Sequence, residues 1–138
     1  MVKVSRSFTI DASRNSVWDF ISDPNNRVRF LPSVKGYRSL GDGEFEWDIH
    51  IPVVGGTISF RTHDIERIEG KRVEFKGEHR IVSLRGVNEL REEGDDDEVE
   101  VKVVFEVDSR IPGVESAFKR IFRRELRHLQ KGMVSELS

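Results

Sequence analysis

Apolar and polar residues alternate with a period of two over much of this chain, and this pattern limits its fold more than any other feature. In the run 44–51 every second residue is apolar, and the residues between are charged or polar. The run 99–107 has a valine or phenylalanine at every other position. Such alternation is typical of strands that bury one face and expose the other. The sequence therefore predicts an antiparallel sheet that rests on a core.

Turn residues divide the alternating part of the chain into six or seven strands. One run, 2–10, comes first, and the others lie within 34–107. Gly41-Asp42-Gly43 and Glu69-Gly70-Lys71 are predicted turns, because glycine readily adopts the positive φ that tight turns require. The apolar phase slips by one residue near His63-Asp64, which predicts a β-bulge there.

Two strand registers follow if neighbouring strands turn their apolar faces to the same side. Opposing Ile49 to Phe60 satisfies this condition for one hairpin. Centring the last hairpin on Gly94-Asp95 opposes Leu90 to Val99 and satisfies it for another. Each face is expected to be well specified, since a slip of one residue would move the apolar set to the solvent side.

Helical spacing of apolar residues occurs towards both ends of the chain. Ser13 is a predicted N-cap for a short helix, which the run Asp23-Pro24-Asn25-Asn26 is expected to break, and a second short helical turn is expected before Pro32. The segment after Pro112 has a broad apolar stripe and is the longest predicted helix. Strands grouped together, with helices at the ends, indicate an α+β fold. We expect one helix-grip domain, 1–138, in which a curved antiparallel sheet wraps around the C-terminal helix.

Composition excludes several kinds of site. The chain has no cysteine, so it has no disulfide, thiolate metal site or cysteine nucleophile. It also lacks Gly-x-Gly-x-x-Gly, Walker and Gly-x-Ser-x-Gly patterns. The N-terminus lacks the apolar run of a signal peptide, and no stretch approaches the ~18–20 apolar residues of a membrane span. We therefore expect a cytoplasmic protein with no transmembrane segment and no cofactor.

The histidines do not form a predicted metal site. His50 and His63 are expected on the outer face of the sheet, four residues of strand apart, and His128 on the polar side of the last helix. That spacing, roughly 13 Å at ~3.3 Å per residue, is too wide for one metal ion. We expect no metal ligands in this chain.

Three polar residues, Thr62, His79 and Asn88, have a phase that points them into the core. A buried polar group needs a hydrogen-bond partner, so each either contacts a neighbour or a buried water, or orients the polar group of a ligand. His79 is also the one candidate acid or base for a cyclase-like reaction. No carboxylate is clearly placed to orient this histidine, which weakens the catalytic interpretation.

Aromatic side chains on facing surfaces favour a ligand cavity between the sheet and the C-terminal helix. Core packing is the simpler explanation for any single ring, and it is their number that favours a cavity. The residues predicted to bind a ligand are Phe30, Trp47, Ile49, Phe60, Thr62, Phe75, His79, Asn88, Val101, Phe118 and Phe122.

Two charged runs each have a structural and a functional interpretation. The acidic run 92–98 lacks the spacing of an EF-hand loop and is expected to be a solvated hairpin tip. The cations within 119–131 are expected to form a solvated helix face paired with acidic strands, with an anionic lipid or nucleic-acid surface as the alternative. No aromatic residues interleave with these cations on the basic face and the net charge is -2, so nucleic acid is not an expected partner.

Taken together, these features resemble the START-like superfamily, also called the polyketide cyclase-like or SRPBCC superfamily. The matching residues are Val17-Trp18-Asp19-Phe20-Ile21-Ser22-Asp23-Pro24, Phe30-Leu31-Pro32-Ser33-Val34, the Gly41-Asp42-Gly43 hairpin and the final helix. The Leu-Pro-x-Val and Gly-Asp-Gly spacing is most similar to proteins of the carbon monoxide dehydrogenase G-type subunit group. The resemblance covers essentially the whole chain and implies the helix-grip fold. Members of the superfamily include lipid and hormone carriers, polyketide cyclases, quinone-binding proteins and co-chaperones, so it implies no catalytic set.

Three functions remain open at this point. We favour binding of an apolar small molecule, such as a lipid, a quinone or a polyketide. The first alternative is an enzyme of polyketide cyclase or dehydratase type that uses His79. The second is an accessory module that contacts a larger enzyme, as the likeness to a dehydrogenase subunit implies. Such a module would have an exposed apolar patch. A protein partner and peripheral membrane contact are therefore possible.

Overall fold

Seven strands and three helices make up the part of the chain that the computed structural model describes, which is all residues except 52–55, 93–97 and 138. The elements are β1 (Val2–Ile10), α1 (Arg14–Ser22), α2 (Pro24–Phe30), β2 (Val34–Gly41), β3 (Glu44–Ile51), β4 (Gly56–Ile68), β5 (Arg72–His79), β6 (Val82–Glu92), β7 (Val99–Asp108) and α3 (Val114–Leu137). All neighbouring strands are antiparallel, in the order β1-β7-β6-β5-β4-β3-β2. This arrangement confirms the predicted α+β helix-grip fold.

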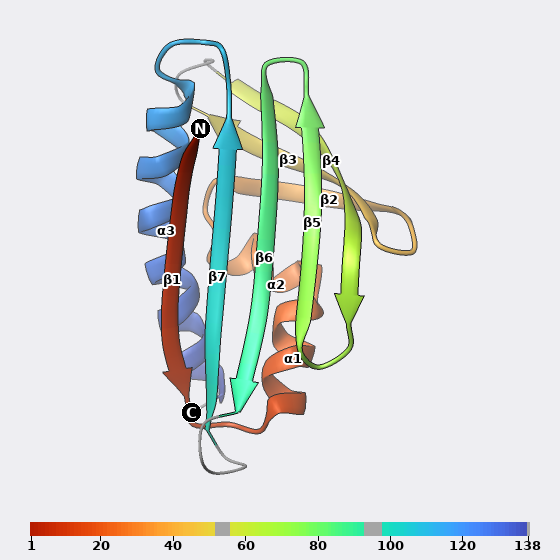
Figure 1. Ribbon diagram of the computed structural model, residues 1–138, viewed down its shortest axis with the longest axis vertical. Coiled ribbons are helices and arrows are strands. Elements are labelled where there is room, and N and C mark those ends of the chain that lie inside the picture. The colour runs from red at the N-terminus through yellow and green to blue at the C-terminus, as the bar shows by residue number, and fades with distance from the viewer. Residues whose placement is uncertain (52–55, 93–97, 138) are drawn as a thin grey trace.

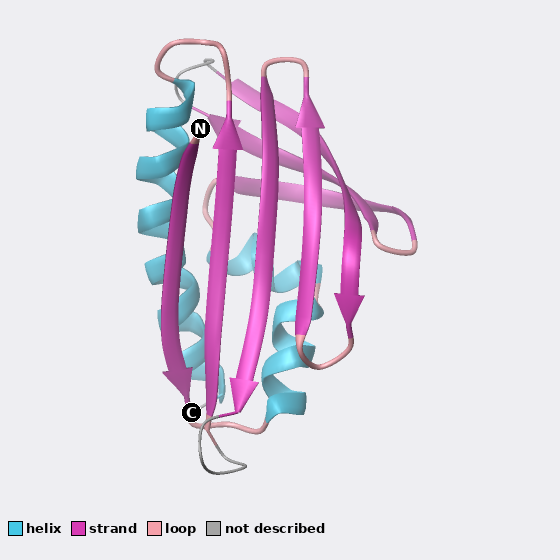
Figure 2. Cartoon of the chain, in the orientation of Figure 1, coloured by secondary structure: helices cyan, strands magenta, loops and turns pink. Residues whose placement is uncertain are grey.

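The sheet curves around a concave side that holds all three helices. In Figure 1 the strands β1, β7, β6 and β5 stand side by side, the long β4 bends, and β3 and β2 cross behind them. The helix α3 runs along β1 and β7, and α1 and α2 lie together beside its C-terminal half (Figure 2). Since α1 and α2 connect the two edge strands β1 and β2, they close the concave side next to α3.

Both predicted registers are wrong by two residues, although each strand turns the predicted face inward. Phe60 lies opposite Trp47, not Ile49, because the ladder continues as far as Ile51 opposite Gly56. The same shift puts His63 opposite Glu44, six residues of strand from His50. A shift of two residues leaves the period-two pattern unchanged, so the pattern alone cannot detect it.

The last hairpin has the same kind of error. Leu90 lies opposite Val101, not Val99, because Val99 pairs with Glu92. The predicted turn at Gly94-Asp95 and most of the acidic run lie outside the described residues. The predicted bulge in β4 is confirmed one position later than expected, since the β4–β5 register shifts between Asp64 and Glu66.

Short polar side chains set the ends of the first two helices. The Ser13 hydroxyl accepts a hydrogen bond from the backbone N–H of Ser16, which confirms the predicted N-cap. Asp23 ends α1 and caps α2 through the N–H of Asn25. The expected break over Asp23–Asn26 is therefore wrong in extent, because Pro24 occupies the first turn of α2, where proline is tolerated.

Packed aromatic rings fill the space between α3 and the sheet. The rings of Phe118 and Phe60 meet edge to face with centroids 6.1 Å apart, and Phe122 stacks on Phe105 at 4.5 Å. Phe60 is 0% exposed and Phe118 1% exposed, so this interface is closed to solvent. Within the described residues, no helix is long and apolar enough to cross a membrane.

A buried carboxyl ties α3 to the segment between α2 and β2. Glu125 of α3 is 0% exposed and accepts hydrogen bonds from the backbone N–H and the hydroxyl of Ser33, the latter at 2.7 Å. Burial raises the pKa of Glu125, and the two hydrogen bonds from Ser33 oppose that shift. The contact fixes the end of α2 relative to α3 and so helps to position the helix that borders the cavity described below.

Candidate ligand cavity

A cavity of about 530 Å³ lies between the α1–α2 pair and the concave face of β3, β4 and β5. Its volume is within the range of small-molecule sites, about 300–1,000 Å³. The lining residues are Ile21, Ser22, Pro24, Arg27, Asp42, Gly43, Phe45, Trp47, Thr62, Asp64, Arg67, Val73 and Phe75. None of these described lining residues belongs to α3, so the cavity is not where the sequence analysis expected it, between the sheet and the C-terminal helix.

The apolar wall is built from aromatic residues of β3 and β5. The rings of Phe45 and Trp47 lie 5.4 Å apart, and Phe75 faces them from β5. Phe75 is paired across the ladder with Gly86, and a Cβ atom at Gly86 would overlap the Phe75 ring. The absence of a Cβ atom at Gly86 therefore leaves room for the outer edge of the Phe75 ring over β6.

Thr62 and Trp47 form a polar contact within this wall. The indole N–H of Trp47 donates to the Thr62 hydroxyl at 2.8 Å, and both side chains are buried. Gly77 lies opposite Thr62, and a Cβ atom there would come within 2.9 Å of the threonine methyl group. The hydroxyl can still donate its own proton, so Thr62 offers a hydrogen-bond donor at the cavity wall.

Arg27, which was not among the predicted site residues, brings a positive charge to the cavity. Its guanidinium carbon lies 5.6 Å from the centre of the Trp47 ring and 5.3 Å from that of Phe75, within the range of cation–π contacts. Burial lowers the pKa of Arg27 to about 10, and the charge of Asp64 opposes that shift. Arg27 therefore remains protonated at neutral pH, with two aromatic rings as its protein contacts.

Two of the other charged residues at the cavity, Asp64 and Arg67, pair with each other. Arg67 lies 3.4 Å from Asp64 and 2.8 Å from Glu69, and its guanidinium covers the Trp18 ring at 5.4 Å. The hydrogen bond to Glu69 raises the pKa of Arg67. Glu69 also accepts the indole N–H of Trp18 at 2.7 Å. These contacts connect α1 to β4 and leave Arg67 with carboxylate partners that Arg27 lacks among the described residues.

The structure brings together three of the predicted ligand-binding residues, Trp47, Thr62 and Phe75, in the cavity lining. Asn88 lies at a separate small pocket of about 20 Å³, which Arg27 also borders. Phe30 stacks on Phe20 with centroids 5.5 Å apart. The remaining apolar candidates are outside the cavity lining and belong to the packed core, namely Ile49, Phe60, Val101, Phe118 and Phe122.

His79 lies at the end of β5, outside the cavity lining. Its ring centre is 5.6 Å from that of Phe60, and its Nδ1 accepts the backbone N–H of Ile81 at 3.3 Å. The inward phase predicted for His79 is consistent with its contact to Phe60. The described residues that line the cavity include no histidine, so this geometry gives no support to His79 as a catalytic group there.

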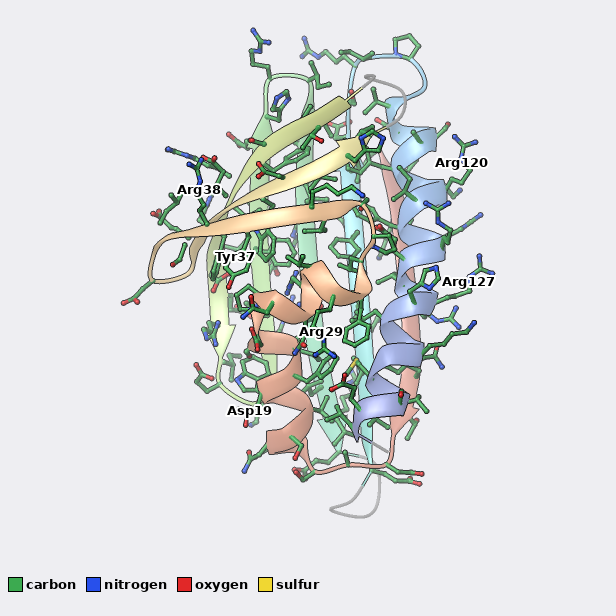
Figure 3. The ribbon with its side chains drawn as sticks, turned by 180° about the vertical axis from the view of Figure 1, so that it is seen from behind. Asp19, Arg29, Tyr37, Arg38, Arg120 and Arg127 are labelled. Carbon is green, nitrogen blue, oxygen red and sulfur yellow. The ribbon has the colours of Figure 1, made fainter. Side chains whose placement is uncertain are left out.

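The cations of α3 form a surface separate from the cavity. Arg120 and Arg127 project from the outer side of α3 in Figure 3. Among the described residues the expected pairing of this face with acidic strands is not seen, because no described carboxylate lies within 4 Å of the cations at 119–131. The described residues also contain no group of three or more histidine or acidic side chains placed to hold a metal ion.

Comparisons with solved structures agree with this fold. A START superfamily protein from Mycobacterium smegmatis is 20% identical with a TM-score of 0.78, and the match covers 99% of both chains. The Zhui aromatase/cyclase from Streptomyces sp. R1128 is 13% identical with a TM-score of 0.75, over 98% of this chain and 92% of that one. A protein from Thermus thermophilus is 14% identical with a TM-score of 0.76, over 97% and 95%. At such identities the likeness shows the fold alone.

Sequence comparison identifies the family. No curated protein matches the chain. A family model described as polyketide cyclase / dehydrase and lipid transport matches residues 1–133. The START-like resemblance is thereby confirmed, while the finer likeness to the G-type subunit of carbon monoxide dehydrogenase stays a hypothesis. The chain belongs to the polyketide cyclase / dehydrase and lipid transport family.

Proposed function

We propose that this protein binds a small, largely apolar molecule, such as a lipid, a quinone or a polyketide, in the cavity bordered by α1 and α2. The observation that supports this most directly is the cavity of about 530 Å³, in which an aromatic wall from β3 and β5 lies beside polar and charged side chains of α1, α2 and β4. Membership of a family that includes lipid transport and polyketide cyclisation agrees with it. The position next to α2, away from the rings packed against α3, is the site that we assign to the ligand.

Native mass spectrometry of the purified protein, followed by organic extraction, tests the proposal. We expect a bound molecule at one copy per chain, and its extract would name the chemical class. A variant that fills the cavity sharpens the test. Ser22→Phe places a ring at the cavity lining, whereas Ser39→Phe adds the same ring on the exposed part of β2.

The two variants separate cavity binding from adsorption to the surface. Ser22→Phe is expected to lose the bound molecule, and Ser39→Phe to retain it. Equal occupancy in both variants would show that the molecule binds elsewhere. An unliganded mass for the wild type, together with no binding of added lipids, quinones or polyketides, would contradict the proposal and shift attention to the accessory-module alternative.

A cyclase or dehydratase remains the second candidate function, because the family description names both activities and Zhui is an aromatase/cyclase. Such an enzyme needs a group that transfers a proton next to the bound substrate. Asp42 and Asp64 are the described carboxylates at the cavity lining. Turnover of a linear polyketide mimic by the wild type, and its loss in Asp64→Asn with binding retained, would establish this alternative.

A further inference from the structure

Of the two arginines at the described cavity lining, Arg27 is the one that has no carboxylate within 4 Å. It projects from the short helix α2 and borders both the large cavity and the small pocket beside Asn88. Its spacing from Pro24, at i−3, places both on one face of α2, and Leu31 follows as the C-cap residue. Pro24 borders the same cavity and Leu31 the small pocket, so this face is turned to the interior of the domain.

The described residues supply Arg27 with rings but with no acceptor. No carboxylate among them lies within 4 Å of the guanidinium, and its side chain donates no hydrogen bond to any of them. Arginine has five N–H donors, and those of the half-buried Arg27 are therefore free to bind water or a ligand. The nearby Asp64 is already 3.4 Å from Arg67. The charge of Arg27 is therefore balanced by Asp64 only at longer range.

A positive charge and an apolar wall lie side by side at this point of the cavity. The guanidinium lies over the Trp47 and Phe75 rings, and Phe45 and Val73 extend the apolar wall beyond them. A planar guanidinium binds a planar oxyanion with two parallel hydrogen bonds, which a single-point cation cannot do. A ligand with a carboxylate at one end and a hydrocarbon or aromatic body would satisfy both surfaces together.

We propose that the ligand of this cavity is an amphipathic carboxylate, and that Arg27 binds its carboxylate group while the rings of β3 and β5 contact its apolar body. This inference rests on the proposed function, because it specifies the chemistry of a molecule bound in the same cavity. It adds that the ligand carries a negative charge. Arg27 is accordingly the residue that would distinguish acids from neutral molecules of the same shape.

Matched pairs of probes test the charge and the cavity separately. Isothermal titration calorimetry with dodecanoate and dodecanol, and with 2-naphthoate and 2-naphthylmethanol, compares an acid with an alcohol of similar shape. The wild type is expected to bind each acid about tenfold to a hundredfold more tightly than its alcohol, as charged hydrogen bonds typically provide. In Arg27→Gln that preference is expected to disappear, while the affinity for each alcohol stays within about twofold.

Two further variants control for charge and for folding. Arg29→Gln removes a cation from the same helix, but Arg29 is exposed, pairs with Glu136 and does not line the cavity. It is expected to keep the preference for acids. Arg27→Lys keeps the charge without the planar fork and is expected to retain part of the preference. Thermal unfolding of each variant shows whether it is folded. If Arg27→Gln does not fold, the ratio of acid to alcohol affinity measured on the wild type still tests the inference.

The outcomes separate this inference from the proposed function. Equal affinity of the wild type for acids and alcohols, or an unchanged preference in folded Arg27→Gln, would overturn the assignment of a carboxylate ligand and leave an apolar binding cavity. Failure of all four probes to bind would overturn both. Loss of acid preference in Arg29→Gln as well would show that the effect comes from the general charge of α2 rather than from Arg27.

Discussion

The same concave sheet meets α3 and the α1–α2 pair in different ways. Against α3 the contact is filled, with the Phe105 and Phe122 rings stacked at 4.5 Å and Phe60 and Phe118 excluded from solvent. Against α1 and α2 the contact leaves a cavity of about 530 Å³. The long helix brings large apolar residues every turn, whereas the seven-residue α2 brings an arginine to the corresponding surface.

This difference indicates a division of roles between two halves of the concave side, the filled half at α3 and the half at α1 and α2 that contains the cavity. The α3 interface buries several aromatic and aliphatic side chains almost completely, and such burial is the main stabilising contribution to a fold. The α1–α2 side can then remain incompletely packed and contain a charged group, because its cavity is not needed for the stability of the sheet. Substitutions on the two sides would strengthen this division or refute it.

The largest expected effect is on the filled side. Phe118→Ala should lower the free energy of unfolding by about 3–5 kcal/mol, because it removes a ring that is 1% exposed and leaves a void. Phe45→Ala, at the half-buried wall of the cavity, should cost less stability but weaken ligand binding. Urea unfolding and calorimetry on both variants measure the contrast. Equal losses of stability, or loss of binding in folded Phe118→Ala, would refute the division.

The second effect concerns Phe75, which lines the cavity and also contacts Phe105 of the filled half, with ring centroids 6.3 Å apart. Gly86→Ala should push the Phe75 ring into the cavity, since the added Cβ would overlap that ring. Overpacking of this kind typically costs about 1–3 kcal/mol, and binding should weaken with it. Gly36→Ala is a matched control on β2, where the added Cβ would come no nearer than 3.9 Å to its closest neighbour. The control should change stability by less than about 0.5 kcal/mol. Equal effects of the two substitutions on binding would show that the missing side chain of Gly86 does not determine how far the Phe75 ring extends into the cavity.

Sequence patterns identified the inward faces of the strands but not the place of the cavity. The period of two correctly turned Trp47, Thr62 and Phe75 inward, because side chains of one phase must share a face. It could not decide the registers, since a shift of two residues preserves that phase. The aromatic rings that led to the prediction of a cavity beside α3 fill that space instead. Only three-dimensional packing distinguishes rings that touch from rings that leave a gap.

Arg27 was missed for a different reason. Arginine is usually exposed, and a segment of seven residues is too short for its apolar periodicity to show which face is inward. The helical spacing of Pro24 and Arg27 was the available signal. It becomes informative only when the helix is known to begin at Pro24, a proline that was predicted to belong to a break.

A smaller effect is expected at the buried carboxyl that links α3 to the α2–β2 segment. Burial raises the pKa of Glu125 above its ordinary value of 4.5, so the folded protein keeps this proton at a pH where the unfolded chain has lost it. Stability from this group is therefore fully present below the unfolded pKa and falls as pH rises through the folded pKa. Glu125→Gln cannot ionise and should gain stability relative to the wild type across that window.

Urea unfolding at a series of pH values from 4 upward measures this difference. Parallel curves for the wild type and Glu125→Gln would mean that Glu125 does not titrate differently in the folded state. Ser33→Ala is the companion variant, because it removes the hydroxyl that donates to Glu125 at 2.7 Å. It should cost about 1–3 kcal/mol, as expected when a buried acceptor loses its partner.

The smallest expected effect is at His79, which separates the binding and enzyme hypotheses. His79 contacts Phe60 on the filled side and does not line the cavity. Its replacement by alanine should therefore cost about 0.5–1.5 kcal/mol of stability, the usual range for an aromatic contact, and leave ligand affinity unchanged. His50→Ala, on the exposed outer face of β3, should be close to neutral.

A tenfold loss of affinity in folded His79→Ala would place the ligand on the α3 side and refute the division between the two halves. Loss of turnover with binding retained would instead make His79 a catalytic group, and the protein an enzyme that uses a histidine outside the cavity lining.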